Sequence, residues 1–298
     1  MTEIPLVLGG HSFISQLGND PATSADEQCA IVESCLNAGI GWFDTTYQPE
    51  RVALGSVLER LGRRSEAMIF AWNFFRDFAP RDEALGEADY YQTRHIDLIL
   101  EQLRTSYVDC LVMVPLRDPE KNLQQQELLL QWKKRGYVRS LGLWVEDLQA
   151  PEEKKSENIF RFAIRPVNVT NVTTNDPAPK LAAWKAAGCE TLATSPFFRG
   201  WELDRIAAAV SHRGWQKTAT VRSTLADLLL RFTCFQPGVD RTIVAMRKVE
   251  WIRRNLESFA KGPLTAKENE QLQRYRRLAS GNNHKPGWWV TLRRGFAR

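Results

Sequence analysis

The stretch GIGWFDTTYQPERVALGSVLERL, residues 39–61, contains the transition on which the fold depends. Residues 39–44 form a short apolar run that predicts a buried strand ending at Asp44, and residues 50–62 place apolar side chains at helical spacing. A strand that leads directly into a helix is the repeating unit of parallel α/β folds. The turn between them carries an acid, Asp44, and an exposed-looking phenol, Tyr47, which raises the question of a proton-transfer site.

The same alternation continues along the whole chain. Eight apolar runs predict strands, at residues 5–10, 39–44, 67–72, 108–114, 138–144, 165–170, 189–195 and 241–246. Segments between them predict helices, at residues 26–39, 50–62, 88–106, 122–136, 157–164, 178–188 and 223–235. Eight such units in about 250 residues favour a closed (β/α)₈ TIM barrel over an open doubly wound sheet. We therefore expect one α/β domain over residues 1–298, with additional helices at 251–260 and 265–279 and a C-terminal tail at 280–298.

Composition narrows the classes of partner. The net charge of +5 is spread along the 298 residues, which argues against nucleic acid as the main partner. No run of about 18 apolar residues and no signal-peptide pattern occurs, so we expect a cytoplasmic protein that does not insert into membranes. The five cysteines form no C-x-x-C pair and no metal-ligand spacing exists, which predicts packed thiols and no metal site.

Chemistry in a TIM barrel sits at the C-terminal ends of the strands. Besides Asp44 and Tyr47, the side chains predicted to line a pocket there are Trp72, Asn73, Val114, Trp144 and Glu146. The alternative for the tryptophans is ordinary core packing, which is how most indoles in strand-like runs are used. Of the four dispersed histidines, interpreted as structural or surface residues, His11 alone follows a predicted strand end.

Several motifs, in order along the chain, resemble the aldo-keto reductase family. GIGWFDTTY is similar to the family's G-I-N-x-F-D-T-A-x-x-Y, LGSVLERL to L-G-x-A-L, and LRTSYVDCLVM to L-x-x-D-Y-I-D-L-Y-L-L-H. RGYVRSLGLWVED, TSPFFRG and VAMRKVEWIRRN resemble three later motifs of the family, so the likeness spans nearly the whole chain. The resemblance implies an eight-fold barrel that binds a small molecule and, in typical members, reduces a carbonyl with NADPH. It also implies that the tail folds over the barrel mouth and shapes the substrate pocket.

The resemblance further implies a catalytic tetrad, of which half is present. In the family, a tyrosine gives a proton to the carbonyl, a lysine paired with an aspartate lowers its pKa, and a histidine orients the substrate. Asp44 stands in the aspartate position, and Tyr47 keeps the family's distance to Leu54 but lies two residues nearer the aspartate. Trp72 replaces the lysine and Val114 replaces the histidine. Without its cation, Asp44 should resist ionisation near a barrel core, and the Tyr47 proton is poorly poised for transfer.

The cofactor contacts that the resemblance implies are replaced at the nicotinamide end and kept at the phosphate end. Trp144 and Val145 replace the Ser-Asn pair that holds the nicotinamide carboxamide, and Thr194 replaces the aromatic residue that stacks on the ring. At the phosphate end, the residues at family-like positions are Ser195, Arg199, Arg247, Lys248, Glu250 and Asn255. NADP(H) is therefore a candidate ligand whose nicotinamide the protein would hold only weakly. The alternative for the basic residues is a solvent-exposed face that binds no ligand.

Three functional hypotheses follow. The first is a divergent family member that has lost ordinary carbonyl reduction and binds a phosphate-bearing or flat aromatic ligand at the mouth. The second is an NADP(H)-dependent or non-redox acid–base enzyme that uses Asp44 and Tyr47, with Glu146 as a further candidate. The third is a structural or regulatory subunit. We expect a monomer or homodimer in each case.

Overall fold

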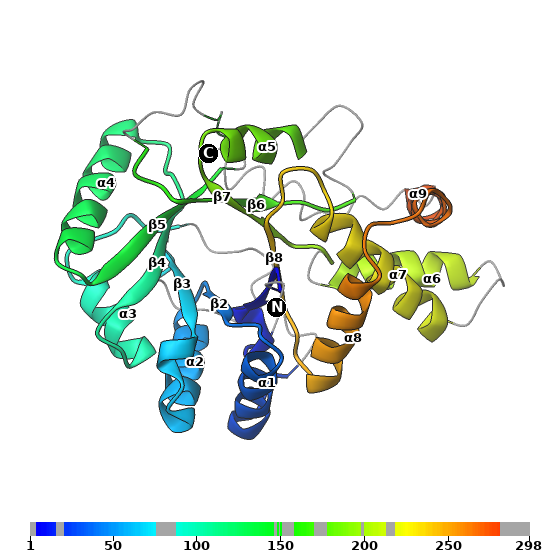
Figure 1. The fold of residues 1–298 in the computed structure, drawn as a ribbon, viewed down its shortest axis with the longest axis horizontal. Helices are drawn as coiled ribbons and strands as arrows, with labels where there is room; N and C mark the ends of the chain where they lie inside the picture. The colour runs from blue at the N-terminus through cyan, green and yellow to red at the C-terminus, as the bar shows by residue number, and fades with distance from the viewer. Residues whose placement is uncertain are drawn as a thin grey trace.

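The computed structural model describes residues 4–15, 21–75, 88–145, 148, 150, 158–169, 178–197, 200–212 and 218–280. Eight parallel strands close into a barrel in which each strand pairs with its neighbours in chain order and β8 pairs with β1 (Figure 1). The strands are β1 Leu6–Gly9, β2 Trp42–Thr45, β3 Met68–Trp72, β4 Val108–Met113, β5 Val138–Trp144, β6 Phe162–Pro166, β7 Glu190–Thr194 and β8 Arg241–Val244. The predicted (β/α)₈ barrel is confirmed.

Helices cover the outside of the strands (Figure 1). Those in the described residues are α1 Ala25–Asn37, α2 Gln48–Leu61, α3 His95–Leu103, α4 Pro119–Lys134, α5 Ala178–Ala186, α6 Trp201–His212, α7 Thr218–Cys234, α8 Val249–Ala260 and α9 Ala266–Ser280. Two short 3₁₀ helices, η1 Gly10–Ser12 and η2 Arg64–Glu66, follow β1 and α2. The tail at 281–298, with its predicted place over the mouth, lies outside the described residues.

The region before β7 differs from the sequence prediction. The helix predicted over 157–164 is wrong, because residues 158–161 are non-helical and β6 begins at Phe162. The strand predicted at 165–170 accordingly begins three residues earlier. A short apolar run such as Phe162–Ile164 fits either a buried helix or a buried strand, and pairing with β5 and β7 decides for the strand. The predicted helix at 88–106 begins only at His95, and α6 was not predicted.

Aromatic side chains fill the end of the barrel at which the strands begin. The ring centroid of Phe70 lies 5.5 Å from that of Trp42 and 5.0 Å from that of Phe162. The guanidinium of Arg241, at the start of β8, lies 3.5 Å from the centre of the Trp42 ring. This packing closes the floor of the barrel, so the opposite end is left for a functional site.

Helix α2 starts directly after β2 and carries the tyrosine and acids of the candidate site. Pro49 lies in its first turn, where a missing N–H costs nothing, and Gly62 ends it with a left-handed φ of 65°. Gly55 brings α2 close to α3, because a Cβ there would lie 2.5 Å from the Gln102 carbonyl oxygen and 2.6 Å from the Leu103 carbonyl carbon. The close approach fixes the helix, and with it the turn at Tyr47.

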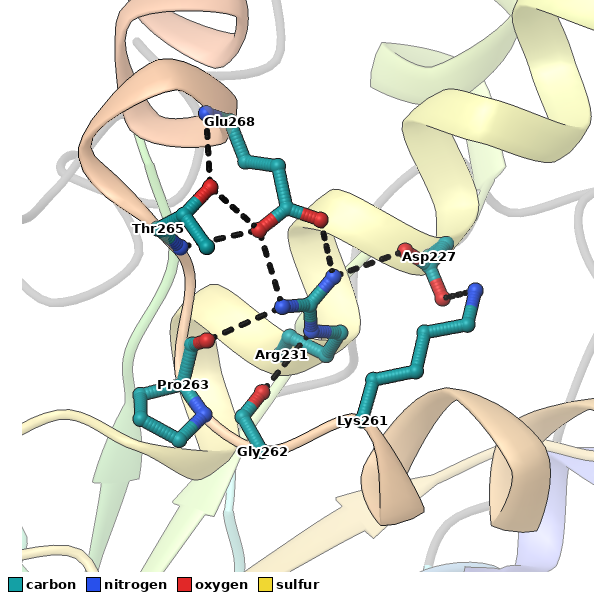
Figure 2. A network of polar contacts seen from close by, with 7 residues as sticks. All are labelled: Asp227, Arg231, Lys261, Gly262, Pro263, Thr265 and Glu268. Atoms are coloured by element: carbon teal, nitrogen blue, oxygen red, sulfur yellow. Dashed lines mark hydrogen bonds and ion pairs between the residues drawn. The ribbon is translucent and has the colours of Figure 1, made fainter.

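Helices α6, α7 and α9 lie side by side and share an apolar cluster of their own (Figure 1). Its buried members include Leu203, Ile206, Val221, Leu225, Leu228 and Leu272. Figure 2 shows how α9 is fixed to α7 beside this cluster. Arg231, with a side chain only 2% exposed, donates to both carboxylate oxygens of Glu268 at 2.6 and 3.0 Å and to Asp227 at 3.2 Å.

The same guanidinium also donates to the carbonyls of Gly262 at 2.8 Å and Pro263 at 2.9 Å in the segment between α8 and α9. The hydrogen bond from Arg231, followed by those from the backbone N–H and hydroxyl of Thr265, lowers the pKa of Glu268 to about 2. Because its charge is paired and its donors are bonded, Arg231 is a satisfied buried cation. Its hydrogen bonds connect α7 to α9 and to the segment between α8 and α9.

Candidate functional site

Asp44, at the C-terminal end of β2, has an indole as its partner. The Trp72 Nε1–H donates to Asp44 Oδ1 at 2.5 Å, and both side chains are about 5% exposed. Burial raises the pKa of Asp44 to about 7, and the hydrogen bond from Trp72 acts in the opposite direction but is the smaller effect. The carboxyl therefore titrates near neutral pH.

Tyr47 is buried and not on the rim, with only 4% of its surface exposed. It occupies the N-cap position of α2, and its ring centroid lies 5.8 Å from that of His11 and 5.6 Å from that of Phe74. His11 belongs to η1, immediately after β1. The turn from β2 to α2 thus brings the phenol of Tyr47 against an imidazole.

Glu50 is a fully buried acid that the sequence reasoning missed. Its Oε2 accepts hydrogen bonds from the backbone N–H groups of Thr46 at 2.6 Å and Tyr47 at 3.4 Å. Its Oε1 lies 3.2 Å from Nδ1 of His11. Burial, with a smaller contribution from the charge of Asp44, raises the pKa of Glu50 to about 8. The only sequence signal was a glutamate three residues after the N-cap, which normally marks an exposed capping position.

Arg51 is the buried cation next to Glu50, and its guanidinium is fully engaged. Nε donates to Gln102 Oε1 at 2.6 Å, Nη1 to the Thr46 carbonyl at 2.8 Å and Nη2 to the Phe74 carbonyl at 3.1 Å. Burial lowers its pKa to about 10, while the neighbouring Glu50 opposes the change. Arg51 therefore holds the loops after β2 and β3 in place against α3.

Asn73 and Val114 are joined by a pair of hydrogen bonds. Asn73 Oδ1 accepts from the Val114 N–H at 2.9 Å, and its Nδ2 donates to the carbonyls of Val114 at 3.2 Å and Asp89 at 2.7 Å. Asn73 is fully buried and Val114 is 3% exposed. The structure thus places Asn73 as a clamp between the ends of β3 and β4.

The two predicted pocket tryptophans touch each other. The ring centroids of Trp72 and Trp144 lie 5.6 Å apart with an interplanar angle of 68°, an edge-to-face contact that leaves no parallel slot between the indoles. Trp144 is partly exposed at the end of β5, so it presents an aromatic surface at the mouth. Glu146 lies outside the described residues.

The residues predicted to contact the phosphates of NADP(H) are only partly available to a ligand. Arg247 donates to the His11 carbonyl at 3.2 Å and also to the carbonyls of Ile14 and Pro21, so it ties the segment after β1 to the segment after β8. Lys248 is exposed at the N-cap of α8, with its ammonium 5.7 Å from the centre of the Trp251 ring.

The other predicted contacts of the phosphate end are placed as follows. Glu250 pairs with Arg254 on the exposed face of α8, and Asn255 is partly buried on the same helix. Ser195 is exposed after β7 and has a left-handed φ of 59°, which is uncommon for a residue other than glycine. Arg199 lies outside the described residues.

Within the described ranges, no group of three or more His, Cys, Asp or Glu side chains is arranged to hold a metal ion. No helix in the described part of the chain has both the length and the apolar character needed to cross a membrane.

The comparison with protein families matches residues 5–277 to the model of the aldo/keto reductase family. The chain belongs to the aldo/keto reductase family. Aldo-keto reductase AKR11C1 from Bacillus halodurans in its holo form is a similar solved structure, with a TM-score of 0.64 and 18% identity over 95% of this chain and 94% of that chain. The PA4992 protein of Pseudomonas aeruginosa has a TM-score of 0.60 and 17% identity over 86% of this chain and 89% of that chain.

At these identities the structural likeness establishes the fold. The comparison with curated proteins gives no match. The assignment of Asp44, Tyr47, Trp72 and Val114 to the four tetrad positions stays a prediction from the sequence. The structure adds Glu50 and His11 as a second acid and an imidazole beside the same turn.

Proposed function

We propose that this aldo/keto reductase family member has lost ordinary carbonyl reduction and binds a small molecule at the barrel mouth. The observation that supports this proposal is the hydrogen bond from Trp72 to Asp44. A lysine in this place would put a positive charge beside the tyrosine and favour its ionised form. An indole N–H is neutral, so Trp72 does not favour ionisation of the Tyr47 phenol as a lysine would. Val114 supplies no imidazole to orient a carbonyl.

The residues fit an NADP(H) molecule better at its phosphates than at its nicotinamide. The exposed Lys248 at the start of α8, together with Ser195 and Asn255, offers polar contacts for a phosphate-bearing ligand. Arg247 is bonded to backbone carbonyls, and Trp144 packs on Trp72 where the carboxamide contacts are expected. Bound NADPH supplies a hydride in the family. We propose that weak binding through the phosphates, without a productive nicotinamide position, is the outcome in this chain.

A second candidate is a non-redox acid–base enzyme that uses Asp44 and Tyr47. The observation that favours it is the presence of two buried carboxyls that titrate near neutrality, Asp44 at about pH 7 and Glu50 at about pH 8. General acids and bases work best when their pKa is close to the operating pH. Such perturbed groups gather at functional sites more often than elsewhere, although buried structural acids share this property.

The test is a cofactor titration followed by a turnover assay. NADPH and NADH are titrated while the tryptophan fluorescence is followed, and the consumption of NADPH is then measured with a panel of aldehydes and ketones. We expect weak or undetectable quenching and no turnover that depends on Tyr47. Tyr47→Phe is compared with Tyr90→Phe, which changes a tyrosine that is 40% exposed. Robust NADPH-dependent turnover that is abolished by Tyr47→Phe and kept by Tyr90→Phe would overturn the proposal.

A further inference from the structure

An imidazole and a buried carboxyl meet where β1 and β2 end. The His11 side chain is 21% exposed and the Glu50 side chain is fully buried, with Nδ1 and Oε1 3.2 Å apart. The imidazole therefore lies between solvent and the acid. The pair is formed by η1 and the first turn of α2, next to Tyr47, whose ring contacts that of His11.

The carboxyl of Glu50 is held in one orientation. Oε2 is fixed by the backbone N–H groups of Thr46 and Tyr47, so Oε1 must face the other way. Within the described part of the chain, Oε1 makes no hydrogen bond of good geometry. Gly10 packs directly against the carboxyl, since a Cβ on it would collide with Oε2 and lie 2.7 Å from the Asp44 carbonyl oxygen. A buried oxygen left to face an imidazole is a costly arrangement unless a proton is shared between them.

The charges around the pair favour one shared proton. On the side of β2, Asp44 repels a negative charge on Glu50, and on α2 Arg51 attracts it, but its guanidinium is bonded to Gln102 and to backbone carbonyls. From the segment after β8, Arg247 donates to the His11 carbonyl. Burial raises the pKa of Glu50 to about 8, so its carboxyl holds a proton unless the imidazole takes it.

We propose that His11 and Glu50 form a proton-transfer pair at the barrel mouth, in which His11 exchanges a proton with a bound ligand and Glu50 exchanges one with His11. The chemical class of ligand is a small molecule with a carbonyl, enol or carboxylate oxygen. When Nε2 gives its proton to that oxygen, the carboxyl proton of Glu50 moves to Nδ1, and the pair is left with one negative charge. A proton from solvent restores the starting state. This function needs neither NADPH nor the lost lysine, so it stands apart from the loss of carbonyl reduction.

The pair is tested by nuclear magnetic resonance titration of the histidine rings in the full chain without cofactor. The chain has four histidines, and His11→Gln assigns the signals of His11. We expect Glu50→Gln to shift the pH midpoint of the His11 titration by about one unit or more, because Nδ1 of the ring then shares no proton with a carboxyl and the two titrations are no longer coupled. The matched control is Glu59→Gln, an exposed glutamate on the same helix, which should leave the midpoint unchanged. An equal midpoint in wild type and Glu50→Gln would overturn the proposal.

A second measurement keeps the proposal testable if Glu50→Gln does not fold. Infrared spectra of an Asp44→Asn background isolate the protonated carboxyl band of Glu50 from that of Asp44. With His11 present, we expect this band to lose intensity and shift as the proton is shared. Adding His11→Gln should strengthen it at neutral pH. A band that is the same with and without His11 would show that the two groups do not exchange a proton.

Discussion

The partner of a single carboxyl determines the ionisation of the acid at the mouth. Asp44 is buried and accepts a hydrogen bond from the neutral Trp72 indole, and the cost of desolvating the charged carboxylate exceeds the stabilisation by that bond. A carboxyl that costs free energy when charged also links stability to pH. Because its pKa is raised in the folded state, the folded chain binds more protons than the unfolded chain between the two pKa values.

Stability should consequently fall as the pH rises. Ionisation of Asp44 lowers the free energy of unfolding between about pH 4 and 7, and ionisation of Glu50 lowers it between about pH 4.5 and 8. Above this range both losses of stability are complete. We expect Asp44→Asn to remove part of this loss, since Asn can still accept from Trp72, and to gain on the order of a few kcal/mol relative to wild type at pH 8. The measurement is urea unfolding from pH 5 to 9, with the exposed Asp204→Asn as control. A wild-type free energy of unfolding that rises over this range contradicts the assignment.

Helix α2 positions two side chains of the candidate site. Its N-terminus presents Tyr47 and Glu50 to the mouth, and its middle lies against α3 at Gly55. Since the helix is rigid, a displacement at Gly55 also moves the turn at Tyr47, where the helix starts. The glycine is thus a packing requirement and not a source of flexibility.

Gly55→Ala should separate α2 from α3. The new methyl would lie within 3 Å of the backbone of Gln102 and Leu103, which has no flexible end to move aside. We expect a loss of about 1 to 3 kcal/mol in the free energy of unfolding and a changed environment of the His11 ring. Gly62→Ala meets no atom within 4 Å and should cost only the left-handed strain of about 1 kcal/mol. Wild-type stability in Gly55→Ala would contradict the close approach.

The contact of α9 with α7 depends on one arginine. Arg231→Ala leaves Glu268 and Asp227 without their shared cation and two carbonyls without a donor (Figure 2). We expect a loss of about 3 to 5 kcal/mol in the free energy of unfolding, measured by urea denaturation. Arg253→Ala removes an exposed pair with Glu257 on α8 and should cost less than about 1 kcal/mol. Similar losses of unfolding free energy in both variants would show that the buried contacts of Arg231 stabilise the fold no more than an exposed ion pair does.

For the whole molecule, most of the fold could be predicted from hydrophobic periodicity, because strands buried on both faces read as short apolar runs. The same property caused the error at Phe162, where an equally short run did not distinguish strand from helix. Within the site, Asp44, Tyr47 and Trp72 were placed at the mouth by their position at strand ends. Glu50 and Arg51 could not be found, since charged residues on a helix normally face water and only the packing of α2 against η1 and α3 buries them.

The two ends of the barrel should respond separately to mutation. Arg241 closes the floor by packing on Trp42 and by donating to Glu190 Oε1 at 2.8 Å, far along the strands from the mouth. Arg241→Met removes the ion pair and the cation over the ring, and we expect a loss of about 3 kcal/mol in the free energy of unfolding.

The His11 titration and the response to NADPH should nevertheless remain at wild-type values, because Arg241 lies at the opposite end of the strands from His11. The control is Arg139→Met, whose cation also lies over a ring, that of Tyr107 at 3.7 Å, but on a side chain 61% exposed. That variant should lose less than about 1 kcal/mol. A changed His11 midpoint in folded Arg241→Met would show that the floor and the mouth are coupled through the barrel core.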